Sequence, residues 1–451
     1  MSASGIMTRS APRLRSLSNL IPKTQKLLSR SLAWTPQPEG SEHRAKWQTT
    51  KRPLADERKP LWEKAYFLKP GDAPVEVGGR HNDLRVGGLK VPNIWLRDNC
   101  QCSACFHGDT RQRLHDTFQI SRDLTIKSHQ TEGNSTDIEW SDGHRSSYSH
   151  SMLRQACATF EERAKIRQGL PEKPVYWGSS ISESPPKVAH DAPEALKAIF
   201  HNIRTYGFTY ITGVDYSTPE PTKDILTSLG GFLRQTHYGG FYVFTADLAS
   251  KDTAYTNIAL EAHTDNTYFT EPSGLQAFHL LSHTDGSGGA SLLVDGFKAA
   301  FDLKAKHREA YDILSTVNVH AHASGNDGIS IQPYRGFPVI SHDPATGDIL
   351  QVRWNSSDRA AIELPISEVE KWYDAARKFD KLLKKKQNEY WEQLTPGNIL
   401  VFDNWRVLHG RSAFTGKRTI SGAYVMRDDW ISKYKMSRWG EGEVLGAIPT
   451  S

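Results

Sequence analysis

The strongest constraint on the fold of this chain comes from three potential metal ligands that are far apart in sequence. His263 and Asp265 stand two residues apart, and His409 follows Asp265 by 144 residues. Two imidazoles and one carboxylate can occupy one face of an octahedral Fe(II) ion and leave the other positions open. Because residues i and i+2 of a β-strand point to the same side, His263 and Asp265 could bind one ion from a single strand. A distant strand must then supply His409.

The motif needs support, because the chain contains 18 histidines and an isolated His-x-Asp is more often a surface pair. Residues 207–213 have the pattern of a buried strand, between helical patterns at 193–205 and 222–234. Further short strands are expected at 275–281, 290–294, 338–341, 349–353, 398–402 and 419–426. Many short strands with Gly and Asp turns between them predict a sandwich or jelly roll. Residues 368–390 are expected to form a long helix, on which three consecutive lysines, 384–386, are interpreted as a solvated face.

The N-terminal segment differs from the rest of the chain in charge. Residues 1–38 carry six basic residues and no acidic residue, a charge of +6, whereas the whole chain has a net charge of +5. The remainder therefore has a net charge of −1, and no basic excess indicates nucleic-acid binding. A basic segment rich in Ser and Leu is typical of a mitochondrial transit peptide, which predicts a matrix protein; the alternative is a disordered basic tail. No apolar run approaches the roughly 18 residues of a membrane-spanning helix, and residues 39–65 are expected to form a linker.

The cysteines indicate a metal site. Cys100, Cys102 and Cys105 fall within six residues, and only Cys157 stands elsewhere. A secreted disulfide scaffold would spread its cysteines along the chain, whereas a tight cluster in an intracellular protein indicates metal ligands. A structural zinc needs a fourth ligand, for which His144 is the best placed of the downstream histidines His107, His115, His129, His144 and His150. The alternative is three free thiols.

This cluster belongs to a predicted small β domain at residues 66–170. Short strands are expected at 89–97, 117–120 and 136–140, followed by a helical pattern at 151–167. The Pro-rich residues 171–186 form a natural boundary. The second domain is then expected to span residues 187–445.

The residues near His409 suggest how a co-substrate could bind. A 2-oxo acid can chelate Fe(II) through its keto and carboxylate oxygens, and its far carboxylate requires a cation, ideally a guanidinium. Arg418 lies nine residues after His409, at the start of the next expected strand. Ser291 could donate a second hydrogen bond, and Arg411 is the rival cation.

Tyrosines are unusually dense around the same motif. They are Tyr238, Tyr242, Tyr255, Tyr268 and Tyr424. Aromatic faces attract a quaternary ammonium, which has no N–H and so cannot be recognised by hydrogen bonds. The alternative is that each ring belongs to the core of a strand. Asp252 stands close by and could pair with an ordinary ammonium group.

Several of these motifs together resemble one family. Residues 262–269, 294–297 and 402–411 resemble motifs of the carnitine-biosynthesis branch of the 2-oxoglutarate-dependent dioxygenases. Residues 95–100, with the cysteine cluster, resemble the N-terminal zinc domain of that branch. The resemblance covers roughly residues 60–435.

The resemblance implies a double-stranded β-helix (jelly-roll) catalytic domain that binds Fe(II) and 2-oxoglutarate, with ascorbate keeping the iron reduced, and a homodimer. The implied iron ligands are His263, Asp265 and His409, and the implied co-substrate residues are Arg418 and Ser291. The implied zinc ligands are Cys100, Cys102, Cys105 and His144. The implied ammonium cage consists of Tyr238, Tyr242, Tyr255 and Tyr424. The family usually has Trp where Tyr242 stands, and the preceding Phe241 could share the role.

The branch contains two activities, which hydroxylate either N6,N6,N6-trimethyl-L-lysine at C3 or γ-butyrobetaine. Asp252 favours trimethyllysine, because a carboxylate can pair with its α-ammonium and would repel the carboxylate of butyrobetaine. The butyrobetaine enzyme typically has Asn at this position. Two alternatives from other classes are a non-catalytic jelly-roll module that binds a small molecule and a hydrolase with a metal-activated water. The sequence offers the hydrolase no convincing general base.

Overall fold

The computed structural model of the protein describes residues 73–79, 82–159, 162–163, 174–245, 256–344 and 346–447. The expected transit peptide, the expected linker and the candidates Asp252 and Tyr255 lie outside these residues. Within the described ranges, no helix is long and apolar enough to cross a membrane.

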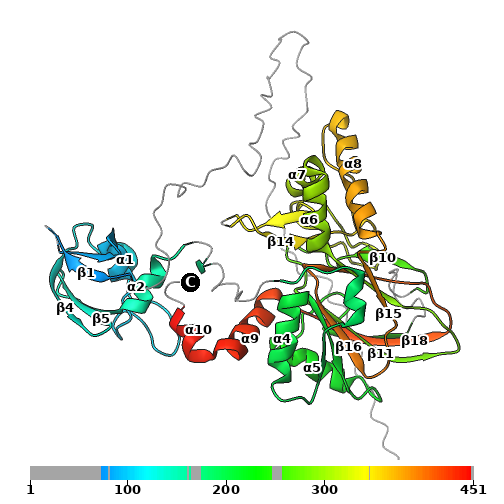
Figure 1. The fold of residues 1–451 in the computed structure, drawn as a ribbon, viewed down its shortest axis with the longest axis horizontal. Helices are drawn as coiled ribbons and strands as arrows, with labels where there is room; N and C mark the ends of the chain where they lie inside the picture. The colour runs from blue at the N-terminus through cyan, green and yellow to red at the C-terminus, as the bar shows by residue number, and fades with distance from the viewer. Residues whose placement is uncertain are drawn as a thin grey trace, which may run out of the picture. The chain divides into compact units, whose positions relative to one another are not determined.

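The N-terminal described residues form a small β-rich region with its own core (Figure 1). One antiparallel sheet contains β1 (Val75–Gly78), β2 (Asp83–Val86) and β3 (Leu89–Lys90), and another contains β4 (Ile126–Glu132), β5 (Ser135–Trp140) and β6 (Arg145–Ser149). Two short helices, α1 (Asn93–Asp98) and α2 (His150–Ala156), complete it. Trp140 and Tyr148 are fully buried, and the Tyr148 hydroxyl donates a hydrogen bond to the Leu96 carbonyl at 2.6 Å. The two rings therefore join the second sheet to α1.

Two strands expected in this region are wrong. The segment 89–97 is a strand only as far as Lys90, because Pro92 follows and precedes the first turn of α1. The segment 117–120 forms a 3-10 turn, Thr117–Gln119, in which the Asp116 side chain accepts a hydrogen bond from the Phe118 N–H. A capping residue and a proline thus outweighed the β propensity of the neighbouring side chains.

The C-terminal described residues form two facing sheets, and the predicted jelly roll is confirmed. The larger sheet has the order β7 (Lys187–Ala189), β8 (Phe208–Thr212), β16 (Asn398–Asp403), β11 (Leu275–Thr284), β18 (Lys417–Val425), β9 (Phe241–Thr245). The smaller sheet has the order β10 (Leu260–His263), β17 (Val407–Arg411), β12 (Ser291–Asp295), β15 (Glu389–Glu392). Phe208, Leu400 and Phe402 of the larger sheet share one core with Leu293 and Val407 of the smaller.

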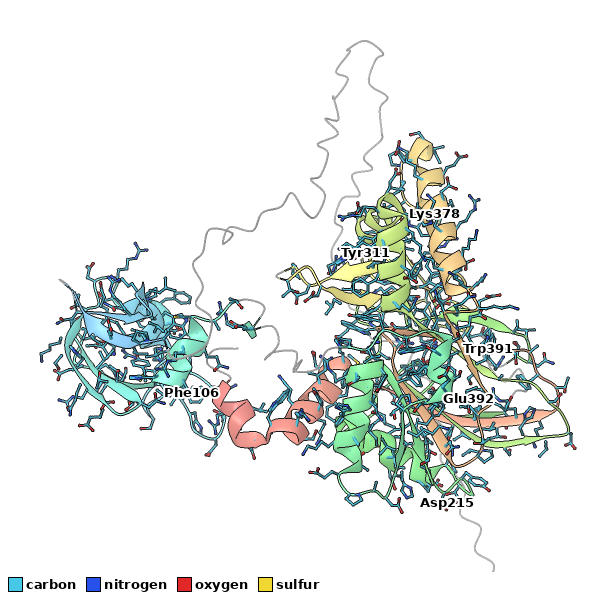
Figure 2. The ribbon with its side chains drawn as sticks, viewed as in Figure 1. Phe106, Asp215, Tyr311, Lys378, Trp391 and Glu392 are labelled. Carbon is cyan, nitrogen blue, oxygen red and sulfur yellow. The ribbon has the colours of Figure 1, made fainter. Side chains whose placement is uncertain are left out.

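Helices cover the outer face of each sheet (Figure 1). On the larger sheet these are α4 (Ala195–Tyr206), α5 (Glu220–Gly230) and α9 (Arg427–Trp439), which ends before the short α10 (Glu441–Ala447). On the smaller sheet they are α6 (Gly296–Lys306), α7 (Arg308–Thr316) and α8 (Ile366–Leu383), beside the hairpin β13 (Ile340–His342) and β14 (Ile349–Val352). Figure 2 marks this layer with Tyr311 of α7 and Lys378 of α8.

The long helix expected at 368–390 is shorter and starts earlier. It ends at Leu383, and the Asn388 side chain donates a hydrogen bond to the Leu382 carbonyl at 2.9 Å. Residues 389–392 instead form strand β15, the edge of the smaller sheet, on which Trp391 and Glu392 lie (Figure 2). Tyr390 of this strand is buried between the sheets, so packing of an aromatic side chain decides against helix here.

Candidate active site

The three potential iron ligands meet at one point between the two sheets. Strand β10 pairs with β17 in a register that sets His263 directly opposite His409. One ligand atom from each of His263, Asp265 and His409 lies within 4.8 Å of the others. A single strand pair thus closes the separation of 146 residues between His263 and His409.

Asp265 reaches this point by a different route from the one expected. Strand β10 ends at His263, so Asp265 lies in the turn that follows and is not a strand neighbour of His263. The next residue, Asn266, has the left-handed φ of 60°. The main chain of Thr264 is held by Trp354, whose carbonyl accepts the Thr264 N–H at 2.8 Å. The convergence therefore depends on contacts from a remote loop, and the i, i+2 rule of a strand does not produce it.

The ligand atoms form a site that attracts a cation. His263 Nδ1 lies 2.8 Å from the Glu261 carbonyl and donates its proton there, and Nε2 lies 3.2 Å from Asp265 Oδ1. His409 Nε2 lies 3.9 Å from the same oxygen. Electron-pair donors that face one another at these distances need a positive charge between them, and two imidazoles with one carboxylate fit Fe(II).

The protonation states of His409 and Asp265 suit metal binding, whereas burial lowers the pKa of His263 but contact with Asp265 raises it above its ordinary value. Burial lowers the pKa of His409 to about 3, so its imidazole is neutral. Burial opposes ionisation of Asp265, but the hydrogen bond with His263 and the neighbouring imidazoles hold its pKa below the ordinary value. Metal ligands must be deprotonated to bind, and these two groups need lose no proton at neutral pH.

A cavity of about 360 Å³ adjoins the three ligands and is lined by residues of both sheets. From the smaller sheet it is lined by Ser291 and Arg411, which are opposite each other in the β12–β17 register. From β18 of the larger sheet it is lined by Arg418, Ile420 and Tyr424. The sequence predicted Ser291, Arg411 and Arg418 at one site, and the fold brings all three to this cavity.

Arg418 is the cation best suited to an incoming carboxylate. Its side chain is buried, and its Nε has no hydrogen-bond partner among the described residues. Burial, with a smaller contribution from the charge of Arg411, lowers its pKa to about 10. Arg411 instead donates to the carbonyls of Thr256 and Ile258 at 2.8 and 2.9 Å. A buried guanidinium with no acidic partner among the described residues is suited to bind an anion such as a carboxylate.

Aromatic rings also line the cavity. Tyr238, Tyr242 and Tyr424 all contribute, and the ring centroids of Tyr242 and Tyr424 lie 5.8 Å apart. Phe241 packs in the core between the larger sheet and its helices, so Tyr242, and not Phe241, faces the cavity. The Tyr242 ring crosses Gly422, its partner in the β9–β18 register, where a side chain would collide with it.

The rim of the cavity carries charges that the sequence did not indicate. It is lined by Glu261, Asp358, Asp380 and Lys384. Lys384 lies 3.2 Å from Asp380 and 3.4 Å from Glu261. Lysines 384–386 were expected to form a solvated face. Lys384, the first of them, lines the cavity instead. Three carboxylates against one ammonium make this rim favourable for a cationic ligand.

Asn404 and Gln276 are two site residues that the sequence analysis missed. Asn404 Oδ1 accepts the Asp265 N–H at 2.8 Å, and Gln276 Nε2 donates to Asp265 Oδ2 at 2.6 Å. The sequence signal for Asn404 was its position inside the motif at 402–411. Gln276 of β11 is only 2% exposed, and a buried amide calls for a hydrogen-bond partner.

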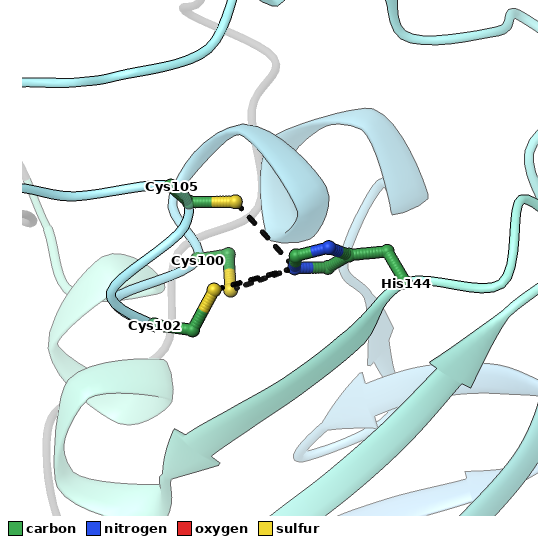
Figure 3. Close-up of side chains that lie close together, drawn as sticks. All are labelled: Cys100, Cys102, Cys105 and His144. Carbon is green, nitrogen blue, oxygen red and sulfur yellow. Dashed lines mark hydrogen bonds between the residues drawn. The ribbon is translucent and has the colours of Figure 1, made fainter.

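A second cluster lies in the N-terminal region (Figure 3). The sulfur atoms of Cys100, Cys102 and Cys105 lie 3.3, 3.6 and 3.4 Å from His144 Nε2. Tetrahedral zinc with ordinary Zn–S and Zn–N bonds separates such atoms by about 3.5 Å. The Arg97 guanidinium lies 3.1 Å from the Cys105 sulfur and would stabilise a thiolate there. The donor set and spacing fit a structural zinc with no vacant position.

The other histidines considered as zinc ligands are engaged elsewhere or lie outside this cluster. His107 Nδ1 accepts from the N–H groups of Asp109 and Thr110, and His150 Nε2 lies 3.0 Å from the Thr136 hydroxyl. His115 lies 3.5 Å from Asp98, and His129 is an exposed residue of β4. His144, in the turn between β5 and β6, is the histidine that the fold brings to the cysteines.

Two family models match this chain. Residues 168–424 match the model described as Taurine catabolism dioxygenase TauD, TfdA family. Residues 86–154 match the model described as Gamma-butyrobetaine hydroxylase-like, N-terminal. The first match contains the candidate iron site, and the second contains the cysteine cluster.

Curated relatives match over most of their length. The chain is 41% identical to the trimethyllysine dioxygenase of Neurospora crassa over 404 residues, which are 80% of this chain and 84% of that one. It is 34% identical to the human protein named trimethyllysine dioxygenase, mitochondrial, over 79% of this chain and 85% of that one. It is 29% identical to the γ-butyrobetaine dioxygenase of Pongo abelii, over 77% and 91% of the two chains.

Proposed function

The chain belongs to the trimethyllysine dioxygenases of the TauD, TfdA family, and we infer from this that it hydroxylates N6,N6,N6-trimethyl-L-lysine at C3, the first step of carnitine biosynthesis. One observation carries the proposal. A single cavity is lined by the three potential iron ligands, by the buried guanidinium of Arg418 and by the faces of three tyrosines. Each part matches one component of the reaction: the metal, the 2-oxo acid and the quaternary ammonium.

His263, Asp265 and His409 would hold Fe(II), which together with 2-oxoglutarate supplies the oxygen-activating chemistry. The chain itself positions the substrate and co-substrate and excludes water from the cavity. The hydrogen bond to the Glu261 carbonyl sets the tautomer in which His263 would bind the metal, and Asp265 would bind it as a carboxylate. No side chain is required to act as an acid or base on the substrate carbon.

Arg418 would hold the far carboxylate of 2-oxoglutarate. Its guanidinium is buried beside the cavity, and two parallel N–H donors match the two oxygens of a carboxylate. Ser291, on the facing strand, would donate a further hydrogen bond. Arg411, whose donors already contact the Thr256 and Ile258 carbonyls, would contribute charge from the side.

The trimethylammonium group would lie against Tyr238, Tyr242 and Tyr424. Cation–π attraction is worth about 0.5–2 kcal/mol for each ring, and more as water is excluded. Tyr242 replaces the tryptophan that the family usually has, which weakens this contact without removing it. Tyr255 would complete the cage on the basis of the sequence resemblance alone.

The choice between trimethyllysine and γ-butyrobetaine rests on the amino-acid end of the substrate. Trimethyllysine carries an α-ammonium and a net positive charge, whereas butyrobetaine is neutral overall. Asp252 is proposed from the sequence as the partner of the α-ammonium. The net negative rim formed by Glu261, Asp358, Asp380 and Lys384 supports a cationic substrate. γ-Butyrobetaine hydroxylation is the second candidate, supported by a relative of lower identity.

The remaining proposals concern the rest of the protein. Cys100, Cys102, Cys105 and His144 would bind one structural zinc in an N-terminal domain proposed to span residues 66–170, and the catalytic domain would span residues 187–445. The basic segment 1–38 would direct the protein to the mitochondrial matrix. Ascorbate would keep the iron reduced, and the active protein would be a homodimer.

A competition assay tests the proposal. The purified protein is incubated with Fe(II), 2-oxoglutarate, ascorbate and O2, and trimethyllysine and γ-butyrobetaine are offered together. The expected result is one added oxygen on trimethyllysine, detected by mass, with an equal amount of succinate. Preferential oxidation of butyrobetaine would select the second candidate, and binding without succinate would indicate a non-catalytic module. The Asp252→Asn variant should lose trimethyllysine turnover while it retains iron.

A further inference from the structure

The two oxygens of the Asp265 carboxylate have different surroundings. Oδ1 faces the ligand nitrogens of His263 and His409, at 3.2 and 3.9 Å. Oδ2 accepts two hydrogen bonds, from Gln276 Nε2 at 2.6 Å and from the Tyr424 hydroxyl at 2.6 Å. One oxygen is thus presented to the metal position, and the other is engaged by two donors.

The two donors form a rigid pair. Gln276 of β11 and Tyr424 of β18 stand directly opposite each other in the strand register, and both are almost fully buried. Gln276 Nε2 also lies 3.5 Å from the Tyr424 hydroxyl. Neighbouring strands of one sheet are difficult to shift past each other, so these donors hold Oδ2 in a defined direction.

The arrangement matters because a carboxylate can bind a metal through one oxygen or through two. An octahedral ion with two imidazoles and a one-oxygen carboxylate keeps three open positions. A two-oxygen carboxylate would leave two, which are both filled by a chelating 2-oxo acid. The third position, which O2 requires, then exists only if Oδ2 stays away from the metal.

We propose that Gln276 and Tyr424 are positioning residues that keep Asp265 a one-oxygen ligand and so preserve the third open position. The proposal rests on the proposed function. It gives Tyr424 two separable roles, because its ring lines the ammonium cage while its hydroxyl binds the carboxylate. Gln276 has no such aromatic role, so the two residues share only the contact with Oδ2.

Three substitutions separate the roles. Tyr424→Phe removes the hydroxyl and keeps the ring, and Gln276→Leu removes the amide donor at nearly constant volume. Tyr390→Phe is the matched control, because it removes a hydroxyl that is buried between the same two sheets and donates to Glu392 Oε2 at 3.1 Å. Thermal unfolding of each variant shows whether it is folded.

The test uses Co(II) in place of iron, so that no turnover is needed. Each full-length protein is titrated with Co(II) and then with 2-oxoglutarate, and the visible ligand-field spectrum and the Kd for Co(II) are measured. Loss of an outer hydrogen bond to a metal ligand typically costs 10–100-fold in metal affinity or activity. We expect the Kd for Co(II) to rise at least about tenfold in Tyr424→Phe and Gln276→Leu. Their spectra should be altered both before and after 2-oxoglutarate is added, because 2-oxoglutarate still fills the two positions that a two-oxygen carboxylate leaves. Tyr390→Phe should match the unmodified protein.

The possible failures are distinguishable. If the unmodified Co(II) protein does not bind 2-oxoglutarate, the proposed function fails. If it binds and folded Tyr424→Phe and Gln276→Leu proteins have the same spectrum and Kd for Co(II), the positioning role is wrong. A change in Tyr390→Phe as large as in Tyr424→Phe would also overturn it, because any lost buried hydroxyl would then suffice.

Discussion

Asn404 and Asp265 hold each other by two hydrogen bonds across 139 residues of sequence. Asn404 Oδ1 accepts the Asp265 N–H at 2.8 Å, and Asn404 Nδ2 donates to the Asp265 carbonyl at 3.0 Å. The same amide donates to the Ser273 carbonyl at 3.1 Å. Asn404 thus supports the turn that carries Asp265 after strand β10 has ended, and it does so from the segment that leads into His409.

Replacement of Asn404 by alanine should disturb the metal site more than the fold. The variant leaves the Asp265 N–H without its partner, at a cost of about 1–3 kcal/mol in the free energy of unfolding. Displacement of Asp265 should weaken Fe(II) or Co(II) binding by roughly 10–100-fold, measured by titration of the metal-free protein. Asn398→Ala, which removes an amide that bonds to the Thr395 hydroxyl, is the control and should bind metal normally. Equal metal affinity in both variants would contradict this role for Asn404.

Replacement of Gly422 by alanine should damage the ammonium cage. An added Cβ would lie 2.2 Å from the Ala277 carbonyl oxygen and 2.7 and 2.8 Å from the Cε2 and hydroxyl oxygen of Tyr242, so strand β11 and the ring must both move. Overpacking of this kind costs about 1–3 kcal/mol in stability, and loss of one ring contact costs about 0.5–2 kcal/mol in binding. We expect a higher KM for trimethyllysine and little change in the KM for 2-oxoglutarate. Gly442→Ala, where an added Cβ meets nothing, should leave both unchanged.

His279 should make the stability of the protein depend on pH below neutrality. Its Nε2 accepts the Gly397 N–H at 3.1 Å, so the ring is neutral and its Nδ1 donates to the Thr222 hydroxyl at 2.7 Å. Burial lowers its pKa to about 4, below the roughly 6.5 of an unfolded chain. As pH falls from about 6.5 to about 4, the unfolded state takes up a proton that the folded state refuses, so stability falls by up to about 3 kcal/mol.

This dependence can be measured by denaturant unfolding at a series of pH values between 4 and 7. His279→Gln removes the titrating group and should flatten the part of the profile that it causes, at the cost of lower stability near pH 7. A profile of the same slope in both proteins would show that His279 does not contribute. Ser421, which donates to the same Thr222 hydroxyl at 3.4 Å, offers a control in Ser421→Ala, which keeps the histidine and should keep the slope.

Removal of zinc should unfold the N-terminal region. We expect one zinc per chain by elemental analysis, and a strong chelator should reduce the stability of the segment around Trp140. Cys102→Ser should abolish stoichiometric zinc, whereas Cys157→Ser should retain it because Cys157 lies outside the cluster. Proteolysis within residues 86–154 after chelation would report the unfolding. A folded, zinc-free protein with intact Cys102 would contradict a structural zinc.

Much of the architecture was predictable because it depends on local patterns. Short segments of strand character between Gly and Asp turns indicated most strands of the larger sheet, such as 275–281 for β11 and 398–402 for β16. The predictions failed where a short segment met a competing local signal or a remote packing partner. The segment 89–97, expected as a strand, is helical after Pro92. Residues 389–392, expected as the end of a helix, form a strand of the smaller sheet because Tyr390 packs between the sheets.

The amino-acid sequence alone determined the chemistry available to this protein: two imidazoles and a carboxylate, a guanidinium, a group of tyrosines and a cysteine cluster. The tertiary structure decided which atoms of these residues work together. Trp354 and Asn404 set the backbone of Asp265, while Gln276 and Tyr424 engage one of its two oxygens. Such contacts depend on strand register across as many as 159 residues, and register is set by the whole packed sheet, so no local pattern encodes it.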